Sequence, residues 1–511
     1  MKKFYNILIC FSVVGMISLS CKKEQLVITN PNTLTVDQFW KTEADAQQGI
    51  NAAYAMFYKP GLWPRWIYFR LDLTSDEGFS KSPWIELADW TRFQYVNYNF
   101  WEGNVVTWRD TYKAIFRCNQ VLANVPAIEF VDPNKKELVL AQAKFLRALH
   151  YYYAAILWEN VPLVLEPSKP DDLPKQSSLA EVWAQVAKDL AEAGAVLPVK
   201  WDDSNVGRPT KGAVNALLAK TYMQQQKWQE AKVALDYFIT GQGAGKYSLV
   251  SNFQDNFSHT NENNSESVFE IQFSDANKGG DGDDPNQNMG SNRAQFFAPR
   301  SIGWSDGQAR TWLVNEFKKE PTTGNKLDPR LQYTLFYQNQ EADFGAKTYG
   351  RTWRWDADEA WFKKYSRDYY RDNEDYFGQN NYRMIRYADI LLMYAEVLNE
   401  LDQRATGVQY VDMVRARAKM STLSIGHPTA LLGKDQFRDR LKMERALELC
   451  GESVRWADLK RWGDLDSPQK VSQVALRDPD FNNFVVGKTI RLPIPEVEVQ
   501  NNQNLTQNPL Y

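Results

Sequence analysis

The sequence has few residues of the kinds that build metal centres and disulfide frameworks. Its 511 residues include three histidines (His150, His259 and His427) and four cysteines, with no C-x-x-C motif. This composition argues against a zinc site. Cys118 and Cys450 each lie inside a helical pattern. A bridge between them is one alternative, but we expect two separate buried thiols, because a chain of this size does not need a single disulfide.

An excess of charge of one sign is also lacking. The chain has 60 basic and 63 acidic residues, for a net charge of -3. A nucleic-acid partner would call for a basic patch, which this balance does not indicate. Beyond the first twenty residues, no apolar stretch approaches the length of a membrane-spanning helix. We therefore expect a body outside the membrane, long enough to bury a sizeable core.

The N-terminus has the features of an export signal. A short basic segment precedes the apolar run Ile7–Leu19, which is too short for a permanent membrane span. The run ends at Cys21, a pattern that resembles a bacterial lipoprotein signal, in which the cysteine is acylated and becomes the new N-terminus. We predict that residues 1–20 are removed and that Cys21 carries the lipid. Ser18 replaces the usual leucine, and plain secretion is the alternative.

Helical periodicity covers much of the chain. Apolar residues recur every three or four positions from Val106 to about Leu157, and again over 181–197. The stretch GAVNALLAKTYMQQQKWQEAKVALDYF predicts two antiparallel helices joined by a turn at Gln225 to Lys227, and it resembles a tetratricopeptide unit. One such unit cannot bury its apolar face alone, so we expect other helix pairs to stack on it, with 108–157 and 384–420 as candidates.

Between Tyr247 and Arg383 the pattern changes. SVFEIQF alternates like a strand, SDANKGGDGDDPNQNMGSN is a polar loop, and RTWRWDADEAWFKKYSRDYY is crowded with aromatic and charged residues. Helical periodicity then resumes. The predicted fold is one mainly α domain over 21–511, a tetratricopeptide-like scaffold with a large irregular lobe. The predicted parts are the scaffold at about 35–245 and 384–465, the lobe at about 247–383, and an extended C-terminal segment at 466–511.

Three stretches resemble the SusD/RagB family of Bacteroidetes surface lipoproteins. They are NYRMIRYADILLMYAEVLNEL, ERALELCGESVRWADLKRWG and LPIPEVEVQNNQNLTQNPLY. KFLRALHYYYAAILWENVPLV, LDPRLQYTLF and WFKKY agree with it in the same order, so the resemblance spans nearly the whole mature chain. The sequence departs from the family at Asn160 and Leu510, where glycine is usual. Both positions lie at expected turns.

The resemblance implies an α-helical fold with four tetratricopeptide-like pairs and a lipid-anchored binding protein at the outer-membrane surface. It also implies a partner, a SusC-like TonB-dependent transporter, to which captured oligosaccharides or, in some members, peptides are passed. It implies neither catalysis nor an obligatory cofactor, although some members carry a calcium ion. The alternatives are a glycoside hydrolase with two carboxylates about 5 to 10 Å apart and a lid on the transporter with no ligand affinity of its own.

The charged residues of the family motifs are interpreted as structural. Arg386, Asp389 and Glu396 share a helix whose other face is apolar, so they require partners inside the helical stack. The expected partners are Glu444, Arg445, Arg455 and Asp458. The alternative is an acid/base pair in an active site.

The stretch GWSDG at 303–307 fits the letters G-x-S-x-G of a nucleophile elbow. That motif needs a strand before the serine and a helix after it, yet Pro299 stands where the strand would run. One histidine, His427, follows Ser305 in the chain. We therefore predict a turn leading into the helix TWLVNEFKK, with an esterase as the alternative.

The acidic loop with Asp281, Asp283 and Asp284 is the candidate for calcium. It fails the EF-hand pattern, because Pro285 occupies a ligand position and no glutamate follows at the twelfth place. We expect a solvated loop without metal.

Aromatic residues make up 14 % of the chain, including 18 tryptophans. Trp108, Trp183, Trp228 and Trp456 fall at helical-core spacing and are predicted to serve packing. Tryptophans in loop-like stretches are the candidates for sugar stacking, because an exposed ring usually serves recognition. The predicted ligand-binding residues are Trp84, Trp90, Trp304, Trp353 and Trp355, with Asp76 as a hydroxyl acceptor. Alanine at position 353 or 355 is predicted to weaken glycan binding while barely changing the melting temperature.

Overall fold

The computed structural model describes residues 39–95, 102–276 and 288–511. The predicted leader, the lipidation site Cys21 and the acidic loop at 281–284 lie outside these residues. Within the described part of the chain, no helix combines the length and apolar character that crossing a membrane requires.

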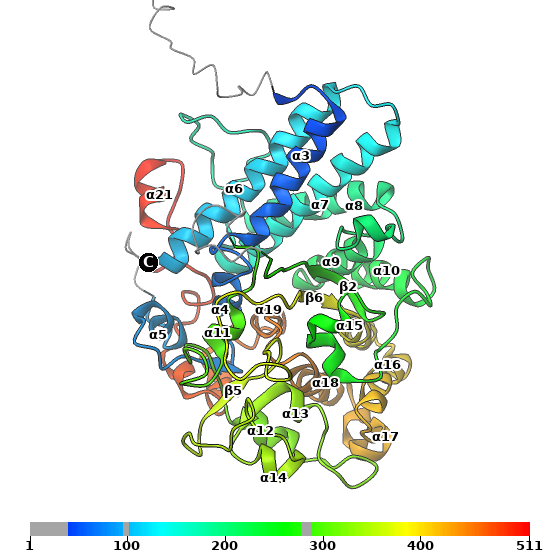
Figure 1. Cartoon of the computed structure of the whole chain (residues 1–511), viewed down its shortest axis with the longest axis vertical. Helices are drawn as coiled ribbons and strands as arrows, with labels where there is room; N and C mark the ends of the chain where they lie inside the picture. The colour runs from blue at the N-terminus through cyan, green and yellow to red at the C-terminus, as the bar shows by residue number, and fades with distance from the viewer. Residues whose placement is uncertain (1–38, 96–101, 277–287) are drawn as a thin grey trace, which may run out of the picture.

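Long helices build the first half of the scaffold. They are α3 (Glu43–Tyr54), α6 (Glu102–Asn124), α7 (Pro133–Trp158), α8 (Leu179–Val196), α9 (Lys211–Gln224) and α10 (Trp228–Ile239). Their ends follow the local sequence. Ser178 and Glu181 form a capping box at the start of α8, and Pro133 opens α7 directly after the N-cap Asp132. These helices pack in sequence order, α6 on α7, α7 on α8, α8 on α9 and α9 on α10 (Figure 1).

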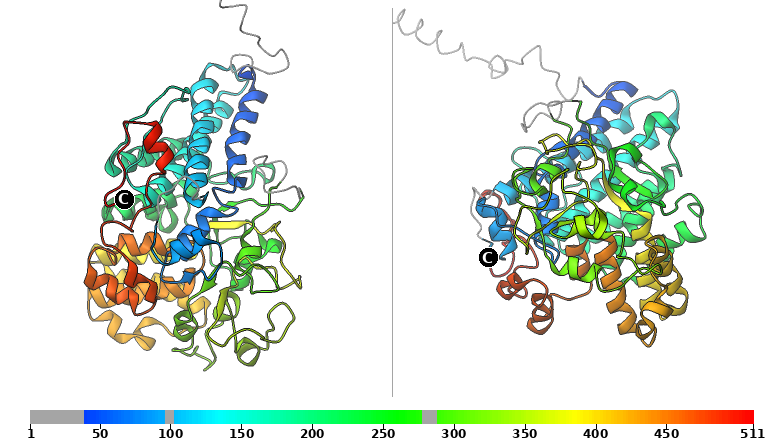
Figure 2. Two further views of the ribbon diagram at one scale, coloured as in Figure 1. Left: turned by 90° about the vertical axis from the view of Figure 1, so that its left-hand side faces the viewer. Right: turned by 60° about the horizontal axis from the view of Figure 1, so that its bottom comes forward.

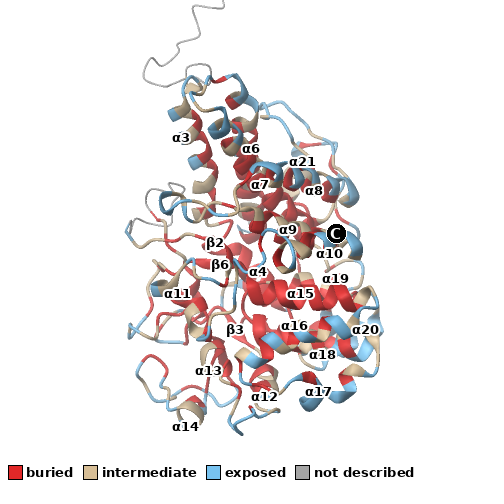
Figure 3. Ribbon diagram, turned by 90° about the vertical axis from the view of Figure 1, so that its right-hand side faces the viewer, coloured by how far each residue is buried: buried red, intermediate tan, exposed pale blue. Residues whose placement is uncertain are grey.

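The second half of the scaffold comprises α15 (Tyr387–Glu400), α16 (Arg404–Arg417), α17 (Leu423–Gly426), α18 (Lys434–Leu449) and α19 (Arg455–Arg461). Helix α15 packs on α10, α16 and α18, so it joins the two halves. Figure 3 shows α15 as almost wholly buried, whereas α17 at the edge is largely exposed. The mainly α, tetratricopeptide-like fold predicted from the sequence is confirmed.

The irregular lobe lies on one side of the helices, as the left view of Figure 2 shows. It contains the short helices α11 (Arg293–Phe297), α12 (Trp312–Phe317), α13 (Leu331–Thr334) and α14 (Gln340–Phe344). Its strands are β2 (Ser267–Ile271), β3 (Gln308–Ala309), β4 (Leu335–Tyr337), β5 (Ala360–Phe362) and β6 (Tyr382–Arg386). Antiparallel pairs form between β2 and β6 and between β4 and β5.

An earlier segment also reaches the lobe. Helix α4 (Trp66–Leu73) leads into β1 (Gly78–Phe79), which pairs with β3, and then into α5 (Ile85–Thr91). Residues near position 80 and residues near position 305 are therefore neighbours in space.

The C-terminal segment is less extended than predicted. It contains α20 (Pro468–Ala475) and α21 (Glu496–Asn501), both short, as its many prolines and asparagines require. Cys118 and Cys450 are buried free thiols, which confirms that they do not pair.

Candidate functional site

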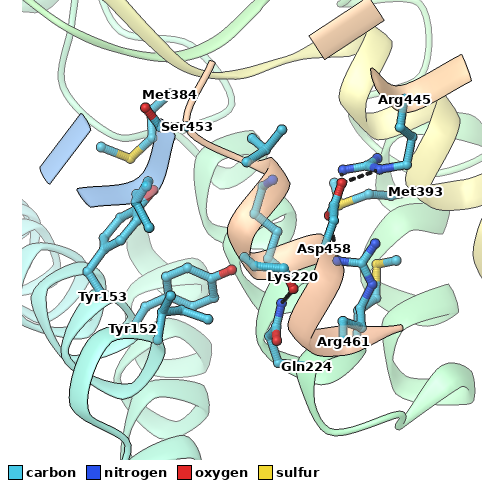
Figure 4. Close-up of a pocket in the computed structure, with 15 residues that line it drawn as sticks. Tyr152, Tyr153, Lys220, Gln224, Met384, Met393, Arg445, Ser453, Asp458 and Arg461 are labelled. Atoms are coloured by element: carbon cyan, nitrogen blue, oxygen red, sulfur yellow. Dashed lines mark hydrogen bonds and ion pairs between the residues drawn. The ribbon is translucent and has the colours of Figure 1, made fainter. Parts of the chain in front are cut away.

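The charged family motifs form ion pairs between helices. Arg445 donates through Nε to Asp458 at 2.7 Å and through Nη1 to Asp389 at 2.8 Å, and Arg461 holds Glu396. Figure 4 shows Arg445 and Arg461 directed at Asp458 beside a cavity of about 20 Å³. Such a space holds little more than one water. The paired carboxylates and the small size of the cavity favour the structural interpretation over an acid/base site.

A larger cavity lies where the scaffold meets β2. Its volume is about 520 Å³, and it adjoins another of about 360 Å³ across the loop Val206 to Arg208. Trp201 and Tyr247 line the first, and Tyr54 and Tyr58 line the second. None of the ligand-binding residues predicted from the sequence lines either cavity.

Trp304 is the most exposed of the predicted tryptophans. The residue is 55 % exposed, yet its backbone is held by hydrogen bonds. The Trp304 amide donates to Gln295 O at 2.8 Å, and the next amide, of Ser305, donates to Ala298 O at 3.1 Å. A Cβ added at Gly303 would lie 2.3 Å from Gln295 O, so glycine is required there. An indole is thus displayed to solvent on a fixed backbone.

Three further rings form one cluster of ring contacts with Trp304. The Trp304 ring lies 4.9 Å from Phe296 in an edge contact and 5.6 Å from Tyr376, and Trp84 lies 6.3 Å from Phe296. Phe296 is buried, whereas Trp84 and Tyr376 are partly exposed. We call Trp84, Phe296, Trp304 and Tyr376 the aromatic surface. The exposed parts of Trp84, Trp304 and Tyr376 offer apolar faces on which the C–H groups of a sugar can pack, and the buried Phe296 ring contacts all three.

Polar contacts hold the aromatic surface together. The Ser82 hydroxyl donates to Asp306, two residues after Trp304, and accepts from the Trp84 amide at 3.1 Å. The Arg65 guanidinium lies over both Phe296 and Tyr376, 5.5 and 5.4 Å from the ring centroids. Segments far apart in the sequence therefore present their rings in one arrangement.

Two predicted ligand-binding residues are wrong, because they are buried. Asp76 is 0 % exposed and is bonded to Arg455 and Arg477, so it cannot accept from a sugar hydroxyl. Trp90 is 1 % exposed and packs on Trp66 with ring centroids 5.4 Å apart.

Trp353 and Trp355 pack into a separate cluster with Trp361. The three ring centroids lie 5.1 to 5.7 Å from one another. Trp355 is buried and donates to Arg300 O at 3.0 Å. Its ring has little surface to offer a ligand, so this assignment is also wrong. Trp353 is only partly buried, and its role as a ligand contact stays a prediction.

The arrangement around Ser305 does not match an esterase. Ser305 is buried, and its Oγ accepts from Trp361 Nε1 at 2.9 Å. The histidine that follows it in the chain, His427, is bonded to Glu320 at 2.6 Å. The next element is the strand β3, and the predicted helix follows as α12, Trp312–Phe317. Among the described residues, no group of three or more His, Cys, Asp or Glu side chains could hold a metal ion.

Sequence reasoning missed Phe296 and Tyr376. Tyr376 stands in the polar, glycine-containing loop NEDYFGQN, the same kind of setting that identified Trp84 and Trp304. Tyr376 would have been predicted as a ligand contact if tyrosines in such loops had been considered together with tryptophans. Phe296 in AQFFAP looks like any core residue, so no sequence signal separates it from packing.

The stacked helix pairs and the irregular lobe define a tetratricopeptide-like helical protein that displays a fixed aromatic surface. A family profile described as SusD family matches residues 265–511, and one described as starch-binding associating with outer membrane matches residues 23–223. The chain therefore belongs to the SusD/RagB family.

Individual relatives match along almost the whole chain. A SusD-like protein of Formosa agariphila is 26 % identical over 532 aligned residues, which cover 95 % of each chain. A SusD superfamily protein from Bacteroides vulgatus has a TM-score of 0.80 at 25 % identity, covering 93 % of this chain and 100 % of that one. A laminarin-binding SusD-like protein has a TM-score of 0.75 at 26 % identity, covering 92 % of this chain and 100 % of that one.

Proposed function

We propose that this protein binds glycans at the aromatic surface and does so without catalysis. The observation that carries the proposal is Trp304, a residue that is 55 % exposed on a backbone held by hydrogen bonds. Because the rings are already in place, little conformational entropy is lost when a sugar packs on them. The laminarin-binding relative, which shares 26 % identity and the same fold, supports a carbohydrate ligand.

The proposal extends to the cell surface and a partner. Cys21 anchors the chain to the outer membrane, and the captured glycan passes to a SusC-like TonB-dependent transporter. The profile described as associating with outer membrane supports this location. In a Cys21→Ala variant, the protein is expected in the soluble fraction. Pull-down of the parent from solubilised outer membranes is expected to recover the transporter, and recovery of the protein alone would contradict the partnership.

The binding experiment is native electrophoresis of the chain lacking the leader and Cys21, through gels containing a panel of polysaccharides. We expect one polymer to retard the parent and not the Trp304→Ala variant. Trp228→Ala, which removes a half-buried ring in α10, is the control and is expected to behave as the parent. Retardation of Trp304→Ala equal to the parent would place the ligand elsewhere.

Assays on the same purified chain distinguish this proposal from the alternative functions. Release of reducing ends from the retarding polymer would favour a glycoside hydrolase. Binding of peptides with no response to any glycan would favour a peptide-binding member of the family. No ligand in either panel would favour a lid on the transporter.

A further inference from the structure

The loop that displays Trp304 has a conformation that its residues do not favour. Ser301 and Ser305 have φ angles of 68° and 60°, in the left-handed region. For a residue other than glycine, this region costs roughly 1–2 kcal/mol. Two such residues within five positions persist only where the surrounding structure holds them. The contacts that hold residues 300–305, here called the 300–305 loop, therefore determine where Trp304 lies.

Two indole N–H groups bind the loop, one at each end. Trp355 Nε1 donates to Arg300 O at 3.0 Å, and Trp361 Nε1 donates to Ser305 Oγ at 2.9 Å. The two rings pack together with centroids 5.6 Å apart, and Trp361 is 0 % exposed. Close packing of the two buried rings restricts the movement of both N–H groups. Each end of the loop is therefore bonded to a buried ring of the same cluster.

The first end of the loop has a second attachment. Arg300 forms a two-bond ion pair with Glu359, with Nη2 to Oε2 at 2.7 Å, and its guanidinium lies 5.8 Å from the Trp361 ring centroid. Between the ends, Ile302 packs into the same cluster as Trp355 and Trp361. Ile302 O also accepts from the Glu374 amide at 3.1 Å, two residues before Tyr376. The cluster therefore contacts two of the segments that carry rings of the aromatic surface, those of Trp304 and Tyr376.

We propose that Trp355 and Trp361 are positioning residues, which fix the 300–305 loop so that Trp304 is held ready for a glycan. They act through their N–H groups and need no contact with the ligand. The proposal rests on the proposed function, that Trp304 contacts a glycan. It also accounts for tryptophan where a purely apolar cluster could use phenylalanine, because each indole supplies a donor in addition to its ring.

The test uses Trp355→Phe and Trp361→Phe, which keep an aromatic ring and remove the donor. Losing one hydrogen bond is expected to weaken binding of the retarding polysaccharide about fivefold, with the melting temperature changed by only a few degrees. Trp228→Phe in α10 is the matched control. Incorporated 5-fluorotryptophan gives a second readout: the ¹⁹F resonance of Trp304, assigned from Trp304→Phe, is expected to shift or broaden in both variants.

A rescue variant separates loop conformation from general stability. Glycine takes the left-handed region without strain, so Ser301→Gly in the Trp361→Phe background is expected to restore part of the lost affinity. A purely structural role for Trp361 predicts no restoration and would overturn the proposal. An unchanged Trp304 resonance in both phenylalanine variants would also overturn it. If Trp304→Ala itself binds as the parent, the proposed function fails, while the ¹⁹F signal still decides whether the cluster positions Trp304.

Discussion

Asp76 and Arg455 lie 379 positions apart in the sequence and form a buried, two-bond ion pair. Arg455 donates through Nε to Oδ1 at 2.7 Å and through Nη2 to Oδ2 at 2.9 Å. Burial alone would raise the pKa of Asp76, but Arg455 and Arg477 outweigh it and lower the pKa to about 2. The pair ties the turn before β1 to α19, so it joins the edge of the lobe to the scaffold.

Asp76→Ala is expected to destabilise the protein by about 3–5 kcal/mol, because Arg455 would remain buried without its carboxylate. Chemical denaturation measures this loss. Asp358→Ala, at an exposed position in the lobe, is the control and is expected to change stability by no more than about 0.5 kcal/mol. If Asp76→Ala instead lost glycan binding at unchanged stability, Asp76 would be a ligand contact after all.

Glu77 predicts a pH dependence of stability between about pH 5 and 8. Burial raises the pKa of Glu77 to about 8, with Asp76 and Asp72 adding to the rise and Arg455 opposing it. The folded state therefore keeps a proton that the unfolded chain releases above its ordinary pKa, so stability is full below that value and falls as pH rises toward 8. The slope is expected to be roughly 1 kcal/mol per pH unit.

Glu77→Gln has no carboxyl to ionise at this position and is expected to have a slope smaller than the parent's by that amount. The remaining slope is kept because Glu86, Glu262 and Asp478, whose pKa values burial also raises to about 7, keep their contributions. Urea unfolding of both proteins across the range measures it. Exposed Glu137→Gln is the matched control and is expected to leave the parent profile unchanged. Parallel profiles for parent and Glu77→Gln would show that Glu77 ionises without cost in the folded state.

The helices and the site differ in how far the sequence could predict them. The turn at Gln225 to Lys227 lies between α9 and α10 as expected, because apolar periodicity and a short polar break are local signals. The site depends on contacts between distant segments. Trp84 meets Phe296 more than two hundred positions away, whereas Trp90, six residues after Trp84, turns into the core. Helix α5 carries Trp90 inward, and the sequence alone offered no reason to separate the two rings.

Leu510→Gly is expected to stabilise the protein by about 1 kcal/mol. Leu510 has a φ of 69°, in the left-handed region that is unfavourable for a residue other than glycine. Because the residue is 66 % exposed, burial of its side chain adds little stability to offset that cost. Leu476→Gly is the control, since Leu476 is 80 % exposed with a φ of -64° at the end of α20, and it is expected to lose about 0.5–1 kcal/mol. Thermal unfolding compares the two, and equal destabilisation would show that position 510 carries no strain.

Trp84 and Trp90 give the sharpest separation of recognition from packing, because both lie in the stretch KSPWIELADW. Trp90→Ala is expected to cost about 3–5 kcal/mol of stability, since the buried ring packs on Trp66 and would leave a cavity. Glycan affinity of its folded fraction is expected to match the parent. Trp84→Ala is expected to weaken glycan binding about fivefold, as its partly exposed ring borders Phe296 in the aromatic surface. Affinity electrophoresis and urea unfolding of both variants measure the two effects. Equal loss of affinity in both variants, or none in Trp84→Ala, would remove Trp84 from the binding surface.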